Sequence, residues 1–516
     1  AGSGLLHPAP KRECSPLPAQ RPEARRPRRV ASRGGMQAGP EKATEATPLA
    51  PGLRGSKPDG KEESAPFYVY FVSFCAALNS VNLGFDIGVN SGVALLIQRD
   101  LGLSDVQVGI FMGSLHFVAA CGGLLNQWIS DRIGRCRTFT SAQVACLIGI
   151  VILCCAKNFG TLMTGRLVMG LGIGISMAID PLYIAEVAPA THRGRLTTWS
   201  EISINMGIML GFVVNWLLVD LPSGVDWRVM LACGLVLPLL VLVLSLTVMP
   251  ESPRWLAAHG READAREVLR RSHPVGEDVE ALVSEIRRAL RTEEEHKRLG
   301  WAPLLCPDAP TRRILAVGVG VAFAQQINGS ESIVLYSPEV FRQAGVAKTA
   351  EGLFLATIFV GFVKMLFIVV SACFLDTAGR RPLLILSTTA MALCEWLLAL
   401  GLQVSITWLS VGSVLVFMAA FSVGVGPVAW LLAAEVFPNH LRAKGMSLAA
   451  FTNRMTSALV ALTFLPLSDL LGLPGYYVLF GSLTALTAVG AYAGCPETKG
   501  KTLEQLAQQF GAVEQQ

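Results

Sequence analysis

Two charged residues occur in stretches of the chain where a charge is costly. Asp86 lies in LGFDIGVNSG and Arg166 lies in TGRLVMGLG, and both stretches are otherwise almost wholly apolar. Charged side chains inside such segments are rare, usually paired and usually functional. An isolated carboxylate would take up a proton there, whereas an arginine cannot readily lose one. The residue types favour an acid–base pair whose separation and reunion bind and release a proton. A static ion pair that only holds two helices together is the alternative.

A second set of charged residues occurs in matching motifs. DRIGR at 131 is echoed by DTAGRR at 376, EVAPATHRG at 186 by EVFPNHLRA at 435, and PESPR at 250 by PETKG at 496. The spacings agree, since 376 − 131 = 245, 435 − 186 = 249 and 496 − 250 = 246. Three motifs in one order at one spacing indicate an internal duplication, which places a binding site between two halves.

The acids and bases of these motifs could form ion pairs that latch the halves closed on one side and release when they move. Charge that only sets membrane topology explains the arginines but leaves the acids unexplained. The candidate gate residues are Asp131, Arg132, Arg135, Glu186, Arg193, Asp376, Arg380, Arg381, Glu435 and Arg442.

The elements that must position these residues are membrane-spanning helices. Of the 516 residues 52% are hydrophobic and only 16% are charged, whereas soluble chains carry about a quarter charged residues. The apolar residues form runs long enough to cross a hydrocarbon core of about 30 Å, and backbone in lipid must be helical. The expected spans are 67–96, 106–129, 138–156, 160–187, 197–218, 229–249, 313–341, 352–375, 382–404, 407–437, 445–471 and 475–495. The sequence therefore predicts an all-α membrane protein of twelve transmembrane helices in two six-helix bundles.

The polar segments divide the chain into five parts. We expect a disordered cytosolic tail (1–66), an N-terminal bundle (67–249), a cytosolic linker with short amphipathic helices (250–312), a C-terminal bundle (313–495) and a cytosolic tail (496–516). The basic, proline-rich start could instead be a transit-like peptide, and Met36 could be the true start.

Lysine and arginine predict the orientation, because cytosolic loops carry an excess of both. They gather in the loops that hold the matching motifs and in the linker, which places both termini in the cytosol. We expect a multi-pass protein of the plasma membrane, with an organellar membrane as the alternative.

Other classes of function find little support. The net charge of +5 reflects loop bias rather than nucleic-acid binding, and the twelve cysteines include no CxxC pair. There is no GxSxG, Walker or HExxH motif, so the chain is not expected to be an enzyme. We expect no cofactor, no metal and a monomer.

One set of motifs resembles the sugar porter branch of the major facilitator superfamily. These motifs are DRIGR, PESPRW, GRLVMGLGIG, QQINGSESIVLYSP, DTAGRRP, GPVAWLLAAEVFP and PETKG, and the resemblance covers residues 67–505. EISINMGIMLG, GSESIVLYSPEVF and FTNRM are most similar to plant-type polyol and monosaccharide proton symporters. The resemblance implies a major facilitator fold and import of monosaccharides or polyols with protons. In the proton-coupled carriers an acid at Asp86 pairs with an arginine at Arg166, and uniporters carry a neutral residue at the first position. A facilitative hexose uniporter and a non-transporting sugar sensor remain the alternatives.

The resemblance also implies a substrate site made of amides, carboxylates and one aromatic platform. Its residues are Glu201, Asn205, Gln325, Gln326, Glu331, Trp430 and Asn453. Amides in membrane helices can instead bond neighbouring helices, the two glutamates could be further proton sites, and a cationic ligand is possible on charge alone. Asn328–Gly329–Ser330 should loosen the seventh span and free backbone groups to line a cavity.

Five further polar residues have no assigned role. Gln127 and Asp180 depart from the family pattern, and Lys364 could pair with a carboxylate or extend toward the membrane surface. Glu395 has no evident partner, and His116 is expected to be a packing histidine rather than a proton relay.

Overall fold

The computed structural model describes residues 66–274, 276–298, 301–501, 505–506 and 509–510. They belong to a single unit that runs from residue 63 to the end of the chain. Within these ranges the ordered elements are all helices. The expected N-terminal tail lies outside the described residues, apart from Pro66.

The first half of the unit contains seven helices. They are α1 (Phe67–Leu101), α2 (Asp105–Ile133), α3 (Arg135–Cys154), α4 (Phe159–Val187), α5 (Ala190–Leu218), α6 (Asp226–Cys233) and α7 (Val236–Thr247). We call this set the N half. Side chains cap several starts, as where Ser104 and Gln107 form a reciprocal capping box at α2 and Asn158 accepts from the Thr161 N–H at α4.

The second half also contains seven helices, which we call the C half. They are α12 (Ala309–Ile327), α13 (Ser330–Gln343), α14 (Ala350–Ala378), α15 (Arg380–Gln403), α16 (Thr407–Val423), α17 (Val425–Val436) and α18 (Asn439–Gly494). Four short helices connect the halves: α8 (Pro253–Ala258), α9 (Glu262–Ser272), α10 (Val279–Arg298) and α11 (Ala302–Leu305).

The expected spans correspond to these helices, with breaks in some of them. Within the described part of the chain, ten helices are long and apolar enough to cross a membrane, judged by length and composition alone. The seventh span is missing from that set because it divides into α12 and α13, where Gly329 takes a φ of 72°. Spans eleven and twelve count as one because α18 continues through a kink at Gly472, where φ is 71°. Allowing for both, twelve crossings result.

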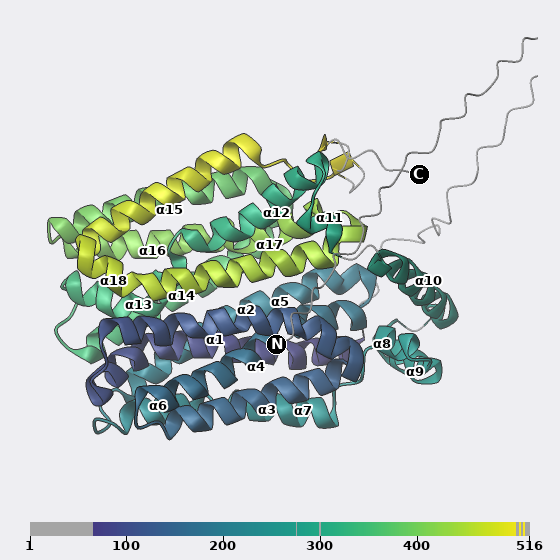
Figure 1. The fold of residues 1–516 in the computed structure, drawn as a ribbon, viewed down its shortest axis with the longest axis horizontal. Helices are drawn as coiled ribbons and strands as arrows, with labels where there is room; N and C mark the ends of the chain where they lie inside the picture. Colours follow the sequence, from purple (N-terminus) through teal and green to yellow (C-terminus); the bar gives the residue numbers. More distant parts are fainter. Residues whose placement is uncertain (1–65, 275, 299–300, 502–504, 507–508, 511–516) are drawn as a thin grey trace, which may run out of the picture. The chain divides into compact units, whose positions relative to one another are not determined.

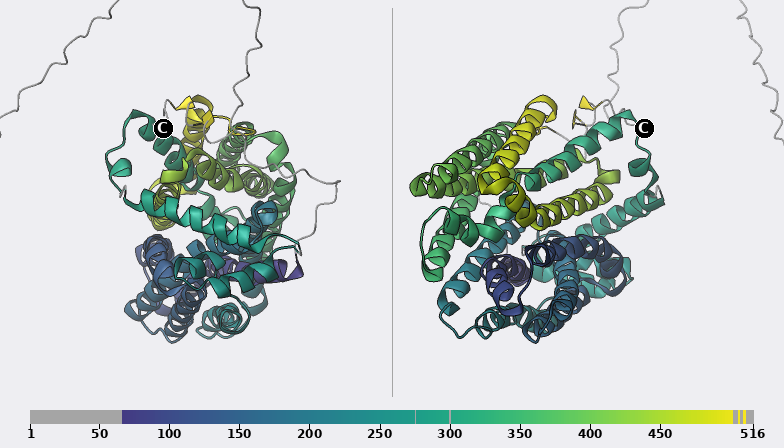
Figure 2. Two further views of the ribbon diagram at one scale, coloured as in Figure 1. Left: turned by 90° about the vertical axis from the view of Figure 1, so that its right-hand side faces the viewer. Right: turned by 60° about the vertical axis from the view of Figure 1, so that its left-hand side comes forward.

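Each half packs its own helices closely and touches the other half along a few of them. In the N half α1 lies along α5, and α3 and α2 lie along α4; in the C half α15 lies along α16 and α18. The halves meet where α2 packs on α18, α5 on α14 and α1 on α13. Figures 1 and 2 show the N half in purple to teal beside the C half in green to yellow.

Glycines bring α1 and α5 close together. A Cβ atom placed on Gly84 would lie 1.9 Å from the carbonyl oxygen of Ile204, and one placed on Gly88 would lie 2.2 Å from that of Ile208. No real Cβ fits at such distances, so these glycines set how closely the two backbones approach. This packing fixes the part of α1 that carries Asp86.

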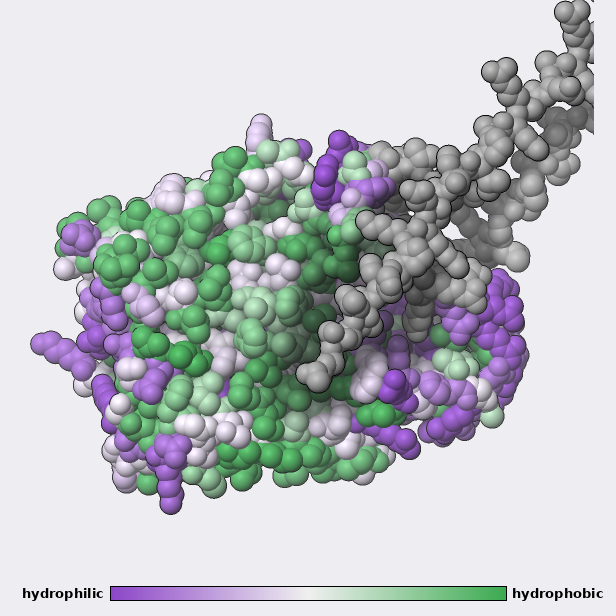
Figure 3. All heavy atoms as spheres, viewed as in Figure 1, coloured by the Kyte–Doolittle hydropathy of each residue, from purple (hydrophilic) through white to green (hydrophobic). Residues whose placement is uncertain are grey.

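The surface is consistent with a membrane environment. In Figure 3 apolar residues cover the sides of the helices, and hydrophilic residues gather at their two ends and over α8–α10. Large side chains such as Leu217, Leu246 and Leu386 are 62%, 67% and 67% exposed, and extensive apolar surface of this kind marks contact with lipid or protein. We call the end that carries α8–α10 the linker end and the opposite one the far end.

Candidate functional site

Asp86 and Arg166 form an ion pair inside the N half. Arg166 Nη1 donates to Oδ1 and Oδ2 of Asp86 at 2.9 and 3.1 Å, and Asn90 Nδ2 donates to Oδ1 at 2.8 Å. The two residues are 3% and 1% exposed. A pair so far from water depends on these few contacts, because removal of either partner leaves an uncompensated buried charge.

The guanidinium of Arg166 is held from a second side by α2. Its Nε donates to the Phe111 carbonyl at 3.2 Å, and it lies over the Phe111 ring at 4.6 Å. Three helices of one half therefore meet at this pair: α1, α2 and α4.

A polar cluster of α12 and α18 lies in the C half. Asn453 Nδ2 donates to Gln325 Oε1 at 2.6 Å and to the Ala322 carbonyl at 3.0 Å. Gln325 Nε2 donates to the Gly426 carbonyl at 2.6 Å, and Gln326 Nε2 reaches Asn453 Oδ1 at 3.4 Å. The structure thus brings three of the expected substrate-site amides into one network.

Two basic residues, Arg454 and Lys364, lie near this network. Arg454 donates to Asn453 Oδ1 through Nε at 3.0 Å and Nη2 at 2.7 Å. Lys364 Nζ lies 5.5 Å from the centre of the Phe421 ring. Both bases act electrostatically on Glu201 and on Glu331, so acids and bases are balanced in this region.

Glu331 lies in the first turn of α13, directly after the break at Gly329. Its Oε1 is 3.4 Å from Nε2 of His116 on α2. His116 was expected to pack rather than to relay protons; its ring nitrogen faces a carboxylate of the other half, and its role stays a prediction. The expected loosening of the seventh span is confirmed, since α12 ends at Ile327 and α13 begins at Ser330.

The remaining expected site residues lie on neighbouring helices. Asn205 Nδ2 donates to the Glu201 carbonyl at 2.8 Å, one turn away on α5, and Glu201 is half-buried. Trp430 is half-buried on α17, which packs against α12. These positions fit the expected site, and the binding roles stay predictions.

At the linker end, Arg135 connects several parts of the N half. Its Nη2 and Nε donate to Glu186 at 2.8 and 2.9 Å, and its Nη1 lies 3.3 Å from Asp131 Oδ1. Its backbone N–H donates to Glu251 Oε1 at 2.7 Å, at the start of α3. A carboxylate at a helix N-terminus satisfies free N–H groups and suits the helix dipole.

The C half repeats this arrangement. Arg380 Nη2 donates to Glu435 at 3.0 Å, and the backbone N–H groups of Arg380 and Arg381 donate to Glu497 at 3.1 and 3.2 Å. Arg381 Nη2 also donates to the Tyr492 carbonyl at 2.7 Å. Glu251 and Glu497 were not among the expected gate residues, although the echo of PESPR in PETKG was a signal for both.

Among the described side chains, these gate pairs each join helices of one half. Arg132 lies over the Trp128 ring at 4.0 Å, and Arg442 Nε donates to the Phe437 carbonyl at 3.3 Å. Arg193 is exposed near the start of α5. The side chain of Asp376 lies outside what the structure describes. A latch between the halves therefore remains a prediction.

Two buried acids have neutral partners. Asp180, which is 0% exposed, accepts from Asn79 Nδ2 and Ser80 Oγ at 2.6 Å each. Glu395, also 0% exposed, accepts from Thr484 Oγ1 at 2.7 Å, and its Oε1 lacks a partner among the described residues. These contacts account for two residues that had no assigned partner.

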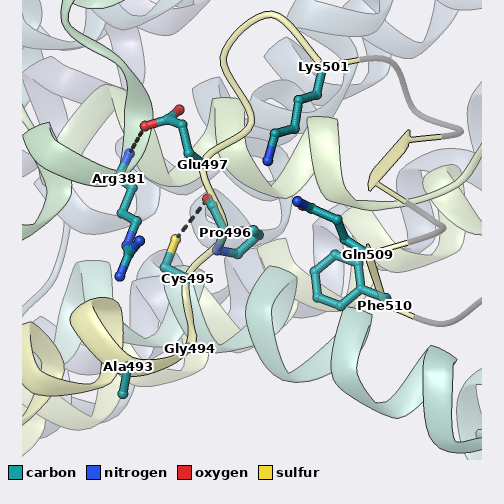
Figure 4. Close-up of a pocket in the computed structure, with 9 residues that line it drawn as sticks. All are labelled: Arg381, Ala493, Gly494, Cys495, Pro496, Glu497, Lys501, Gln509 and Phe510. Carbon is teal, nitrogen blue, oxygen red and sulfur yellow. Dashed lines mark hydrogen bonds between the residues drawn. The ribbon is translucent and has the colours of Figure 1, made fainter.

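Two cavities lie near the ends of the helices. One of about 480 Å³ opens at the linker end of the C half and is lined by Arg381, Glu497, Lys501 and Phe510 (Figure 4). The other, of about 290 Å³, lies at the far end between α1, α2, α13 and α18 and includes Gln98 and Tyr336. The first lies beside the repeated linker-end motif, apart from the central polar groups.

Comparisons with known proteins agree with this architecture. Residues 72–510 match the family model described as "Sugar (and other) transporter". The chain is 40% identical over 453 residues to "Probable polyol transporter 4" of Arabidopsis thaliana. The aligned region covers 86% of this chain and 85% of the relative. It is 33% identical over 451 residues to "D-xylose-proton symporter-like 3, chloroplastic" of the same plant, covering 83% and 80%.

Solved structures give the same result. The inward open conformation of the xylose transporter XylE from E. coli superposes with a TM-score of 0.74 at 27% identity. The match covers 86% of this chain and 100% of that one. The proton:xylose symporter XylE bound to 6-bromo-6-deoxy-D-glucose gives a TM-score of 0.73 at 28% identity, covering 86% and 99%.

Proposed function

The chain belongs to the sugar transporter family, and we propose that it is a proton-coupled symporter that imports monosaccharides or polyols by alternating access. The buried Asp86–Arg166 pair carries this proposal. The names of its relatives support it, since they include polyol transporters and a D-xylose-proton symporter.

The central polar cluster offers groups that suit a sugar or polyol. Gln325, Gln326 and Asn453 present amide groups, and Glu201 and Glu331 add carboxylates that can accept hydroxyl hydrogen bonds. The acids are matched by Lys364 and Arg454 nearby. A site with balanced charge and many acceptors suits a neutral, hydroxyl-rich solute better than an ion, and Trp430 supplies an apolar face for the carbon skeleton.

Proton coupling would follow from linkage between the ion pair and the movement of the helices. While Arg166 contacts Asp86, the carboxylate is stabilised in its charged form. A movement of α4 relative to α1 that separates them leaves the carboxylate buried without its counter-charge, and it then takes up a proton. Return of Arg166 expels the proton, so each transport cycle moves one hydrogen ion with the substrate.

Access to the site would alternate between the two ends. We propose that the far end faces outward and the linker end faces the cytosol, because basic residues gather at the latter. The far-end cavity, which is lined in part by Tyr336 of α13, is then the entrance. The linker-end ion pairs would act as the inner gate. We place the protein in the plasma membrane and take one chain as the transport unit.

Replacement of Asp86 by asparagine tests the proposal. Purified wild-type and Asp86→Asn proteins are reconstituted in proteoliposomes, and uptake of a labelled polyol or pentose is measured with and without an inward proton gradient. The wild type should accumulate substrate only with the gradient. The variant should lose accumulation and keep counterflow, the exchange of substrate across the membrane without a gradient.

Two outcomes would contradict the proposal. Full gradient-driven accumulation by Asp86→Asn would make the ion pair purely structural and would leave a facilitative carrier or another proton site. Binding of substrate by the wild type without any flux would indicate a sensor instead. Proton entry measured with an internal pH dye separates these results from a simple loss of rate.

A further inference from the structure

Among the described residues, one contact between ionisable groups of the two halves joins a nitrogen and an oxygen that both lack hydrogen-bond partners. His116 Nε2 on α2 and Glu331 Oε1 on α13 are 3.4 Å apart, and their side chains are 2% and 10% exposed. Neither atom has a hydrogen-bond partner among the described residues, because the two groups face each other without the alignment of a hydrogen bond. Buried polar atoms are nearly always satisfied in native proteins, so this pair requires a third group.

The internal repeat explains why Glu331 lacks an arginine partner equivalent to Arg166 in its own half. Asp86 precedes Asp131 by 131 − 86 = 45 residues, and Glu331 precedes Asp376 by 376 − 331 = 45 residues. The two acids therefore occupy equivalent positions. The position equivalent to Arg166 is 166 + 245 = 411, which is Val411. An arginine in the fourth helix of the half cannot neutralise Glu331 as it does Asp86.

The other bases near Glu331 are engaged elsewhere. Arg454 donates two hydrogen bonds to Asn453, and Lys364 lies over the Phe421 ring. Both act on Glu331 electrostatically, together with His116. They balance its charge without giving Oε1 a hydrogen bond in the described structure.

We propose that His116 is a substrate-binding residue and that one hydroxyl group of the substrate lies beside His116 Nε2 and Glu331 Oε1, within hydrogen-bond reach of both atoms. This inference rests on the proposed function and adds to it the residue by which the N half recognises a hydroxyl. The hydroxyl donates its proton to Glu331 and accepts the N–H of the Nε2-protonated imidazole, so all three groups are satisfied. A single hydroxyl thus bridges the two halves.

The bridge has a consequence for transport. Because α2 and α13 belong to different halves, the proposed movement of the halves would form and break this contact. A substrate that supplies the bridging hydroxyl favours closure of the site, and one that lacks it leaves two buried polar atoms unsatisfied. The pair should therefore select substrates by the presence of a hydroxyl at one position.

The first test uses wild-type protein in proteoliposomes. Sorbitol, mannitol, myo-inositol, xylose and glucose are offered to find a transported probe, and single deoxy analogues of that probe are then compared. We expect removal of one particular hydroxyl to raise the KM about ten-fold, equivalent to about 1.4 kcal/mol of binding.

The second test removes the imidazole. His116→Ala should raise the KM for the probe about ten-fold and change the maximal rate much less. The deoxy analogue should lose its disadvantage in this variant, because the group that discriminates against it is gone. His259→Gln, a histidine variant on the exposed linker, is the control and should match the wild type.

A double-variant cycle tests whether His116 and Glu331 act on the same hydroxyl. His116→Ala combined with Glu331→Gln should be only slightly worse than the more affected single variant, whereas independent effects would multiply. His116→Gln, which keeps a polar side chain, replaces His116→Ala if the latter is not monodisperse after purification.

Two results would overturn the inference. They are an unchanged KM in a folded His116 variant and a deoxy series with equal KM values at every position in the wild type. If the wild type transports the probe with protons and these results are found, only the role of His116 fails. If the wild type moves no member of the panel, the proposed function fails first.

Discussion

The two halves are alike at the linker end and different in the middle of the helices. Arg135 and Arg380 make the same contacts, with a glutamate of a neighbouring helix, a carbonyl five residues before in the chain, and a glutamate that accepts their backbone N–H. Both follow a glycine with positive φ, Gly134 at 95° and Gly379 at 86°. The duplicated motif has kept its geometry on both sides.

The equivalent acids in the middle have different surroundings. Asp86 is neutralised inside its own half by Arg166, whereas Glu331 faces His116 of the other half. A conserved geometry at the ends with divergent partners in the middle suggests a division of roles. In the proposed mechanism the repeated part shapes and gates the bundle, and the divergent part places the proton site in the N half and the substrate site at the interface.

The largest effect should follow from Arg166→Ala, which removes the partner of Asp86. Breaking a buried ion pair costs about 3–5 kcal/mol because the other charge stays buried. We expect a strongly lowered unfolding temperature in detergent and no measurable uptake. The double variant Asp86→Asn/Arg166→Ala should recover much of the stability but no coupling. If Arg166→Ala is as stable as the wild type, the ion pair with Arg166 does not distinguish Asp86 from Glu331.

Next in size are Arg135→Ala and Arg380→Ala, which test the likeness of the halves. Each removes charge-assisted hydrogen bonds to a partly buried glutamate, at a cost of about 1.5–3 kcal/mol per site. Both should lower the unfolding temperature by similar amounts and slow uptake more than they change the KM. Lysine at either position should restore little, because it cannot reproduce the planar fork of donors. A loss in only one half would contradict the structural equivalence.

A smaller effect is expected from the two acids with neutral partners. Asp180→Asn replaces an acceptor of two short hydrogen bonds and should cost about 1–2 kcal/mol. Glu395→Gln disturbs one bond to Thr484 and should change stability by about 1 kcal/mol or less. Urea or thermal unfolding of both variants, measured in the same detergent, checks which variant loses more stability. Equal losses would show that the count of hydrogen bonds does not determine the difference.

The smallest effect concerns Glu251 and Glu497, whose pKa values differ in direction. Burial raises the pKa of Glu251 above its usual 4.5, against three backbone N–H groups. Burial also acts to raise the pKa of Glu497, but backbone N–H groups of residues 380, 381, 498 and 499 outweigh it, and the pKa lies below 4.5. Glu497 therefore stabilises the fold above its unfolded pKa and loses this contribution as the pH falls.

For Glu251 the sign is reversed, because the folded protein binds the proton more readily and stability falls as the pH rises above the unfolded pKa. Glu497→Gln should reduce the loss of stability that follows when the pH falls below about 4.5. Glu251→Gln should reduce the loss of stability that follows when the pH rises above about 4.5. Unfolding temperatures between about pH 3.5 and 7.5 test both. Parallel curves for the wild type and the two variants would contradict the assignment.

Much of the fold could be predicted because its cause is local. Apolar runs, their lengths and the repeated motifs predict the helices and the two bundles, and the break at Gly329 follows from Asn328–Gly329–Ser330. The interruption of span six between α6 and α7 was not expected, because VMLACGLVLPLL reads as one continuous apolar run.

The side-chain partners were harder to predict because they depend on helix rotation and on contacts between distant segments. The Asp86–Arg166 contact was expected from the family resemblance, and the structure brings these residues together. The partners Asn79 of Asp180, Thr484 of Glu395 and His116 of Glu331 were not expected, since no periodicity relates residues about ninety or more positions apart.

The kink at Gly472 joins the last two crossings of the membrane without a loop. Helix α18 runs from Asn439 to Gly494, and Gly472 is the non-helical residue that divides its two parts. The first part carries Asn453 and Arg454, and the second leads into Glu497 at the linker end. A corner this short limits how far the two parts can move independently. We expect a flexible insertion at Gly472 to weaken the coupling between the proposed substrate site and the linker end, while leaving both crossings intact.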